Sequence, residues 1–204
     1  AASDVYKRQA LHYLRPGAED HEDEKIRRRC YEVLMQAFAT DERAVRTIQH
    51  HGLEDASATI RYMCAFHLGE HRVYASFRKL QHVLNDHEHN DLRTRLAAAK
   101  SLAELGEADG LPLLYDGLGS DWYMERYLAN LGFAAITGRD VNDVEGDYDW
   151  SEGAFVSGGV EARRTRQPIE DARRRAARFT AIADYCTWLR AEHPELYKHL
   201  EGTF

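Results

Sequence analysis

A repeat of about 34 residues constrains this chain more than any other feature of its sequence. Four segments align when they are written under one another, and the second residue of each is an arginine: Arg27, Arg61, Arg95 and Arg126. These arginines are 34, 34 and 31 residues apart. Self-similarity at such a period is typical of repeat proteins, in which each unit stacks on its neighbours. The alignment therefore predicts a stacked array over most of the chain.

Two further columns of the alignment predict how each repeat packs. Four residues after each segment start the residue is small: Cys30, Cys64, Ala98 and Ala129. Eight residues after each start it is large and apolar: Leu34, Leu68, Leu102 and Phe133. Residues four apart share one helical face, so the small residue admits a neighbouring helix and the large one fills the space beside it. On this interpretation the cysteines of the first column are buried small side chains rather than reactive thiols.

A second helix follows the first in each repeat. The segments are 41–49 (DERAVRTIQ), 73–84 (VYASFRKLQHVL) and 108–118 (ADGLPLLYDGL). We expect an all-α fold, an α-α superhelix of about four helical hairpins, because no hairpin can bury its apolar face alone. We also expect the repeated arginines to pair with turn acids such as Asp55, Asp91 and Asp121, or with carbonyl groups at helix ends.

The pattern of residues 94–118 identifies a resemblance. TRLAAAKSLAELGEADGLPLLYDGL contains the arginine, an alanine cluster, L-x-x-L-G and a following L-x-x-L. It resembles the HEAT-repeat family, especially the short bacterial HEAT-like form of phycobilisome lyase-type repeats. FAAITGRD at 133–140 is similar to the way such arrays close. The resemblance covers about residues 22–140 and implies an armadillo-like α-solenoid, but the family includes scaffolds, lyases, hydroxylases and nucleic-acid enzymes.

The chain divides into four expected parts. Residues 1–9 are expected to be a non-native or disordered segment, because Ser3–Gln9 resembles translated adapter sequence that recurs in metagenomic reading frames. The chain would then be a fragment. Residues 10–138 form the repeat array, and 139–165 form an acidic loop or linker. Residues 166–204 form a C-terminal helical cap.

The cap is predicted from an apolar seam on a long helix. Gln167-Pro168 opens the helix, the seam runs from Ile169 through Phe179 to Leu189, and the helix ends before Pro194. The end of a repeat array needs such a cover. Aromatic residues that could supply its bulk, or instead form a recognition surface, are Tyr148, Trp150, Phe155, Tyr185 and Trp188.

Composition excludes several classes of protein. The net charge of −7, with 27 basic and 34 acidic residues, argues against a general binder of nucleic-acid backbones. No apolar run approaches the roughly 20 residues that span a bilayer. Three widely spaced cysteines form neither a disulfide framework nor a zinc pattern. We expect a cytoplasmic protein without a membrane partner, for which nucleic acid is an unlikely ligand.

The eleven histidines include two short clusters that invite a metal-binding interpretation. His50-His51 lies at a helix end and His87-Glu88-His89 in a turn, and neither has the i, i+4 histidine pair of a zinc protease. No phosphate loop or nucleophile elbow occurs. We therefore predict no metal, no cofactor and no catalytic residue, and favour a protein that is not an enzyme.

The predicted binding residues lie on the second helices. In HEAT-like arrays these helices usually line the concave face, and here their residues outside the apolar stripe are Arg43, Arg46, Arg78, Lys79, His82 and Tyr115, with Asp116 beside the last. We predict that this mildly basic strip binds an acidic or aromatic segment of a partner protein. The alternative is that these side chains only solvate the helix faces.

The leading functional prediction is a noncatalytic protein-interaction module or scaffold. The resemblance also implies two alternatives, a lyase or chaperone for a tetrapyrrole chromophore and, less favoured because of the net charge, a HEAT-like DNA-repair glycosylase. A structural piece of a longer solenoid is a further possibility.

Overall fold

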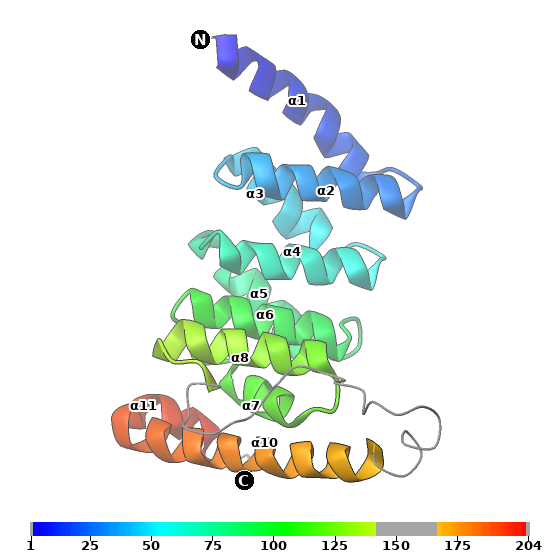
Figure 1. Ribbon diagram of the computed structural model, residues 1–204. Helices are drawn as coiled ribbons and strands as arrows, with labels where there is room; N and C mark the ends of the chain where they lie inside the picture. Colours follow the sequence, from blue (N-terminus) through cyan, green and yellow to red (C-terminus); the bar gives the residue numbers. More distant parts are fainter. Residues whose placement is uncertain (1, 142–166, 203–204) are drawn as a thin grey trace. The chain divides into compact units, whose positions relative to one another are not determined.

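The computed structural model describes the backbone of residues 2–141 and 167–202, and the side chains of residues 9–141 and 171–202. Every regular element within these residues is a helix, which confirms the all-α prediction (Figure 1). Two compact units are present, Ala1–Gly110 and Leu111–Phe204. Among the described residues, no helix is both long enough and apolar enough to cross a membrane.

The first unit contains the first two repeats and the first helix of the third. Their first helices are α2 (Glu24–Phe38), α4 (Ala58–Glu70) and α6 (Leu92–Glu104), which pack in succession in Figure 1. Their second helices begin with α3 (Glu42–Thr47) and α5 (Phe77–Asn85). The segment expected as one helix over 41–49 differs in detail, because α3 passes into a π-helical turn, η1 (Ile48–Gly52). A short 3-10 turn, η2 (Tyr74–Ser76), likewise precedes α5.

Aspartates in the turns start the helices. Asp23 accepts a hydrogen bond from the backbone N–H of Lys25 at 2.8 Å, and Asp41 accepts one from Arg43 at 2.9 Å. Asp91 accepts one from the backbone of Thr94, also at 2.8 Å. Each carboxylate satisfies a backbone donor that has no partner within its helix.

The two packing columns are buried as the alignment predicts. The four large residues are at most 2% exposed, and Cys64, Ala98 and Ala129 are fully buried. Burial raises the pKa of the Cys64 thiol well above its usual value, which fits a packing role. Cys30 is only half-buried, so the interpretation of the cysteines as buried small side chains is weaker in the first repeat.

A helix precedes the first repeat. It is α1 (Ala2–Glu19), and Leu11 and Ala18 are buried in the unit. Residues 2–9 lie within this helix, whereas we expected residues 1–9 to be non-native or disordered. Whether they belong to the natural protein stays a prediction from the adapter-like sequence.

The second unit contains α7 (Leu111–Gly119), α8 (Tyr123–Thr137), α10 (Gln167–Glu192), α11 (Pro194–Tyr197) and η4 (Lys198–Leu200). The long helix begins at Gln167, as its Gln-Pro start predicts. It packs on α8 through Tyr185, whose ring lies edge-on to Phe133 at 5.6 Å and whose hydroxyl is 2.8 Å from the Thr137 hydroxyl. These contacts fit the predicted cap.

The seam of α10 is buried over only part of its length. Ile182, Cys186 and Leu189 are buried, but Phe179 is 52% exposed and Ala176 is also exposed. The expected seam therefore contributes to the core only in its C-terminal half. Tyr148, Trp150, Phe155 and residues 142–165 of the acidic segment lie outside the described residues.

Candidate functional site

The repeated arginines connect one inter-helix turn to the next. Arg27 on α2 donates from Nε and Nη2 to the two oxygens of Asp55, at 2.8 and 2.9 Å. Its Nη1 also donates to the carbonyls of His21 and Glu22, at 2.9 and 3.1 Å. The two side chains of this ion pair are 14% and 5% exposed, and such a two-pronged pair fixes geometry well. Arg27 therefore ties the turn before α2 to the turn before α4.

Arg61 makes the corresponding connection one repeat later. Its Nη1 donates to the Asp55 carbonyl at 2.7 Å, while Nη2 donates to the carbonyl of His89 at 2.6 Å. Nε donates to the side-chain oxygen of Asn90 at 3.0 Å. The amide of Asn90 thus takes the place that the carboxylate of Asp55 has in the preceding repeat. We call Arg27 and Arg61, with these contacts, the arginine ladder.

The expectation for the turn acids is correct only for Asp55. Asp91 caps α6, as described above, while Asp121 accepts hydrogen bonds from Arg175 and Arg178 of α10, at 2.9 and 3.0 Å. Arg95 and Arg126 instead donate to backbone carbonyls, of Leu84 at 2.8 Å and of Ser120 at 2.9 Å. Carbonyl groups are therefore the partners shared by all four repeated arginines.

A hollow of about 390 Å³, here called the α5 hollow, lies between the turn before α4 and helix α5. Leu53, Ala56 and Val83 give it apolar walls. Its polar lining consists of Glu54, Asp55, Arg61, Lys79, His82, Asp86, His89 and Asn90. The ladder residue Arg61 belongs to this lining, so its partly buried hydrogen bonds hold one wall in place.

A second hollow, of about 420 Å³, lies on the other side of the same turn. It is lined by Glu19, Asp20, His21, Arg27, His50, His51, Glu54, Asp55 and Ala56. Both hollows share the turn residues 54–56, and each contains one arginine of the ladder. We call the two together the turn groove. It is a concave surface with a polar and partly apolar lining, and it follows the turns of the first repeats.

The structure brings only two of the predicted binding residues to this groove, Lys79 and His82, which line the α5 hollow. Arg78 is exposed on the same helix, and Arg43 and Arg46 are exposed on α3. Tyr115 lies on α7 in the second unit. It is half-buried, and burial raises the pKa of its phenol. The six residues therefore do not all belong to one described site.

Acidic neighbours reduce the basic character that the sequence indicated. Arg46 forms an ion pair with Glu42, and Lys79 Nζ lies 2.9 Å from Glu54 Oε1. The hydrogen bond from Lys79 lowers the pKa of Glu54. His89 hydrogen-bonds to Asp86 and lowers the pKa of that carboxyl in the same way. The groove thus presents ionised carboxylates as well as cations, so its charge is mixed.

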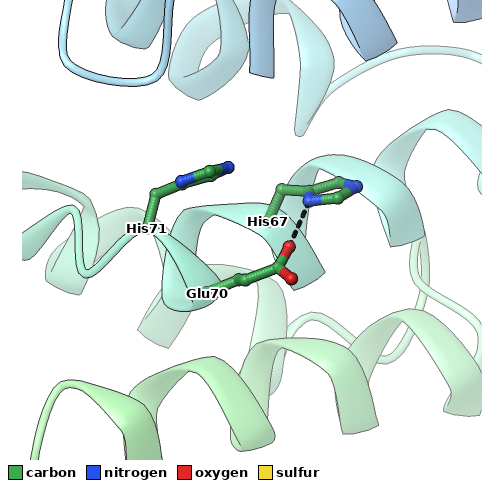
Figure 2. A group of neighbouring side chains, drawn as sticks. All are labelled: His67, Glu70 and His71. Carbon is green, nitrogen blue, oxygen red and sulfur yellow. Dashed lines mark hydrogen bonds and ion pairs between the residues drawn. The ribbon is translucent and has the colours of Figure 1, made fainter. Parts of the chain in front are cut away.

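Sequence reasoning missed a cluster at the end of α4. His67, Glu70 and His71 place one potential ligand atom each within 4.8 Å of one another, as Figure 2 shows. The signal was present in the sequence, because HLGEH at 67–71 has two histidines at i, i+4 on one helical turn. The prediction that no metal is bound considered His50-His51 and the turn at His87–His89, and not this pair.

Stacked helical hairpins joined by an arginine ladder define an α-helical repeat protein. Residues 50–131 match the family model of HEAT repeats. The matched segment, which is less than half of the chain, therefore contains HEAT repeats, as the sequence resemblance indicated. No curated protein and no solved structure matches the chain.

Proposed function

We propose that this protein is a noncatalytic interaction module that binds an extended segment of a partner protein in the turn groove. The observation that carries this proposal is the pair of adjoining hollows, of about 420 and 390 Å³, on either side of one turn. HEAT repeats commonly serve as protein-interaction scaffolds, and solenoids generally use extended concave surfaces for binding.

The size of each hollow supports a peptide ligand. Both volumes are near the lower end of the roughly 300–1,000 Å³ of sites that enclose a whole small ligand. One or two side chains of an extended segment therefore suit each hollow. Contact with two adjoining hollows requires a chain that passes over the turn at residues 54–56.

The lining of the α5 hollow suggests which side chains the segment carries. Leu53 and Val83 offer an apolar wall for an aromatic ring, and aromatic anchors in pockets carry much of the energy of peptide binding. Lys79 and His82 lie at the same hollow, with the exposed Arg78 on the same helix, so an acidic residue beside the aromatic one finds cationic partners. We propose an acidic-aromatic partner segment.

The arginine ladder supports affinity through rigidity. Arg27 and Arg61 hold the walls of both hollows by hydrogen bonds that are formed in the free protein. A preformed surface loses little conformational freedom when it binds, so a larger share of the contact energy appears as affinity.

The test is selection from a displayed library of acidic-aromatic peptides, followed by fluorescence polarisation with purified full-length protein. Arg78→Glu combined with Lys79→Glu reverses one charge that lines the α5 hollow and one exposed charge beside it on the same helix. The matched control is Arg28→Glu with Arg29→Glu on α2, which makes the same change in net charge on exposed side chains elsewhere.

We expect the groove variant to weaken binding by at least about tenfold, because like charges oppose each other across the interface. The control should stay within about twofold of the original protein, since rim charges far from the contact act mainly through long-range steering. Failure to select any peptide, or equal binding by the two double variants, would overturn the proposal.

A further inference from the structure

The cluster of His67, Glu70 and His71 lies apart from the residues of the turn groove. His67 is part of α4, Glu70 is its last residue, and His71 follows as the C-cap. His67 Nδ1 is 2.6 Å from Glu70 Oε2, and the two side chains are 26% and 50% exposed. Figure 2 shows the three side chains close together at the last turn of the helix, with His67 in contact with Glu70.

The backbone at the end of α4 fixes this arrangement. The N–H of Val73 donates to the carbonyl of Leu68 at 2.9 Å, and the N–H of Arg72 donates to that of Gly69 at 2.7 Å. These two bonds define a Schellman motif, with Arg72 in the left-handed conformation at φ 50°. His71 is thereby held one turn above His67, and the two imidazoles stack at 6.1 Å with an interplanar angle of 22°.

We propose that His67, Glu70 and His71 bind one divalent transition-metal ion, with Zn²⁺ as the reference ion. Two imidazoles and one carboxylate form a known three-ligand set for zinc, which leaves a fourth position for water or another ligand. Ligand bonds of about 2.0–2.2 Å place tetrahedral donor atoms about 3.3 Å apart. The three donors lie within 4.8 Å of one another, so small side-chain rotations reach that spacing.

The contact between His67 and Glu70 also fits this chemistry. Their 2.6 Å separation is a hydrogen bond through one shared proton. An ion that binds the imidazole nitrogen and the carboxylate takes the place of this proton. His67 Nδ1 and Glu70 Oε2 then need to move apart by only about 0.7 Å to reach the spacing of tetrahedral ligands. The ligand set disfavours Ca²⁺ and Mg²⁺, which require mainly oxygen donors.

The surroundings of the cluster provide a second acid and an apolar side. Glu104 on α6 lies near enough to interact electrostatically with Glu70, and Lys100 and Arg72 are the cations of the same neighbourhood. On the other side, His67 and His71 border a hollow of about 10 Å³ whose walls include Met35, Ile48 and Val73. These apolar walls shield one side of the imidazoles from water, whereas Glu70 and His71 remain open to solvent.

The experiment is isothermal titration of the metal-free, full-length protein with ZnCl₂, in parallel with the visible spectrum of the Co²⁺-loaded protein. His71→Ala and Glu70→Gln remove one ligand each from exposed or half-exposed positions. Their folding is checked by circular dichroism. The matched control is His50→Ala with His51→Ala, which removes two exposed histidines from a different hollow.

We expect one Zn²⁺ per chain and an intense Co²⁺ spectrum of low coordination number. Each ligand variant should lose at least about tenfold in affinity, because even outer residues of a metal site cost about 10–100-fold when they are changed. The control should bind as the original protein does. No saturable binding, or a site that is lost in the control and kept in His71→Ala, would overturn the proposal. Neither result depends on peptide binding at the turn groove.

Discussion

The fit between Gly52 and Cys64 allows a quantitative test of how the repeats pack. A Cβ atom added at Gly52 would lie 2.5 Å from Cys64 Sγ and 3.0 Å from a ring carbon of Tyr31. Cys64 and Tyr31 are both fully buried, so neither can move into solvent. Cys64 occupies the small-residue column of the alignment. Its sulfur and the missing side chain of Gly52 are therefore complementary in size.

The expected free energies of unfolding follow from this geometry. Gly52→Ala gains about 1 kcal/mol of helix propensity but overpacks the site, which costs about 1–3 kcal/mol. With a contact of 2.5 Å we expect a net destabilisation of about 1–2 kcal/mol. Cys64→Ala removes one buried atom and costs about 1 kcal/mol. The double variant moves a methyl-sized group from one side of the contact to the other. Its free energy of unfolding should lie within about 0.5 kcal/mol of that of the original protein.

The assay is urea unfolding followed by far-UV circular dichroism. The double-mutant cycle should give a coupling energy of about 2 kcal/mol in favour of the double variant. Tryptophan fluorescence serves as an internal reference, because the sequence of the first unit, residues 1–110, contains no tryptophan. If the two substitutions prove additive, the proposed complementarity is wrong.

A matched control comes from the preceding repeat. A Cβ atom at Gly17 would lie 2.9 Å from the sulfur of Cys30, which is only half-buried and can rotate away. Gly17→Ala should therefore keep most of its gain in helix propensity and raise the free energy of unfolding by about 0.5–1 kcal/mol. A penalty as large as that of Gly52→Ala would show that burial does not govern these contacts.

Three further predictions concern charge and backbone conformation. Lys100, whose side chain is 2% exposed, pairs with Glu104 at 2.7 Å. Glu104→Leu leaves the buried ammonium group without this partner and should lower the free energy of unfolding, measured in urea, by about 3 kcal/mol. Lys100→Met combined with Glu104→Leu removes both charges and should stay within about 1 kcal/mol of the original protein. Arg72→Gly relieves the left-handed conformation and should raise stability by about 0.5–1 kcal/mol, measured as an increased urea midpoint. The hydrogen bond from Arg178 lowers the pKa of Asp121. The ionised carboxylate therefore stabilises the folded state at pH values above the pKa of Asp121 in the unfolded chain. This stabilisation is lost as the pH falls through the lower pKa of the folded state. Carbon NMR titration should show the Asp121 pKa moving back towards its ordinary value in Arg178→Met.

Much of the fold was predictable because its signals are local and repeated. The spacing of small and large residues identifies the first helices and their buried faces, including Cys64 and Phe133. The start of α10 at Gln167 follows from a proline in the first turn. The π-helical turn after α3 has no comparable local signal in the sequence.

The site was less predictable because its contacts join distant residues. Lys79 pairs with Glu54, which is 25 residues away, and Arg178 reaches Asp121 across 57 residues. Side-chain type and helical register do not identify such partners. The acidic neighbours of the predicted strip could therefore not be foreseen, and they make the strip less basic than its own residues indicate. The cluster at His67 and His71 was readable from spacing alone. The tetrapyrrole and glycosylase alternatives remain predictions from the resemblance.

The arginine ladder also sets an order in time during synthesis. Asp55 follows Arg27 by 28 residues, and Asn90 follows Arg61 by 29. At about 5–20 residues per second, each arginine leaves the ribosome roughly 1–6 s before its acceptor does. The first helix of a repeat can therefore complete its ladder contacts only after the next turn has been made. Folding of the first unit is then delayed behind translation by about one repeat. Each new turn supplies the hydrogen-bond acceptors that stabilise the repeat before it.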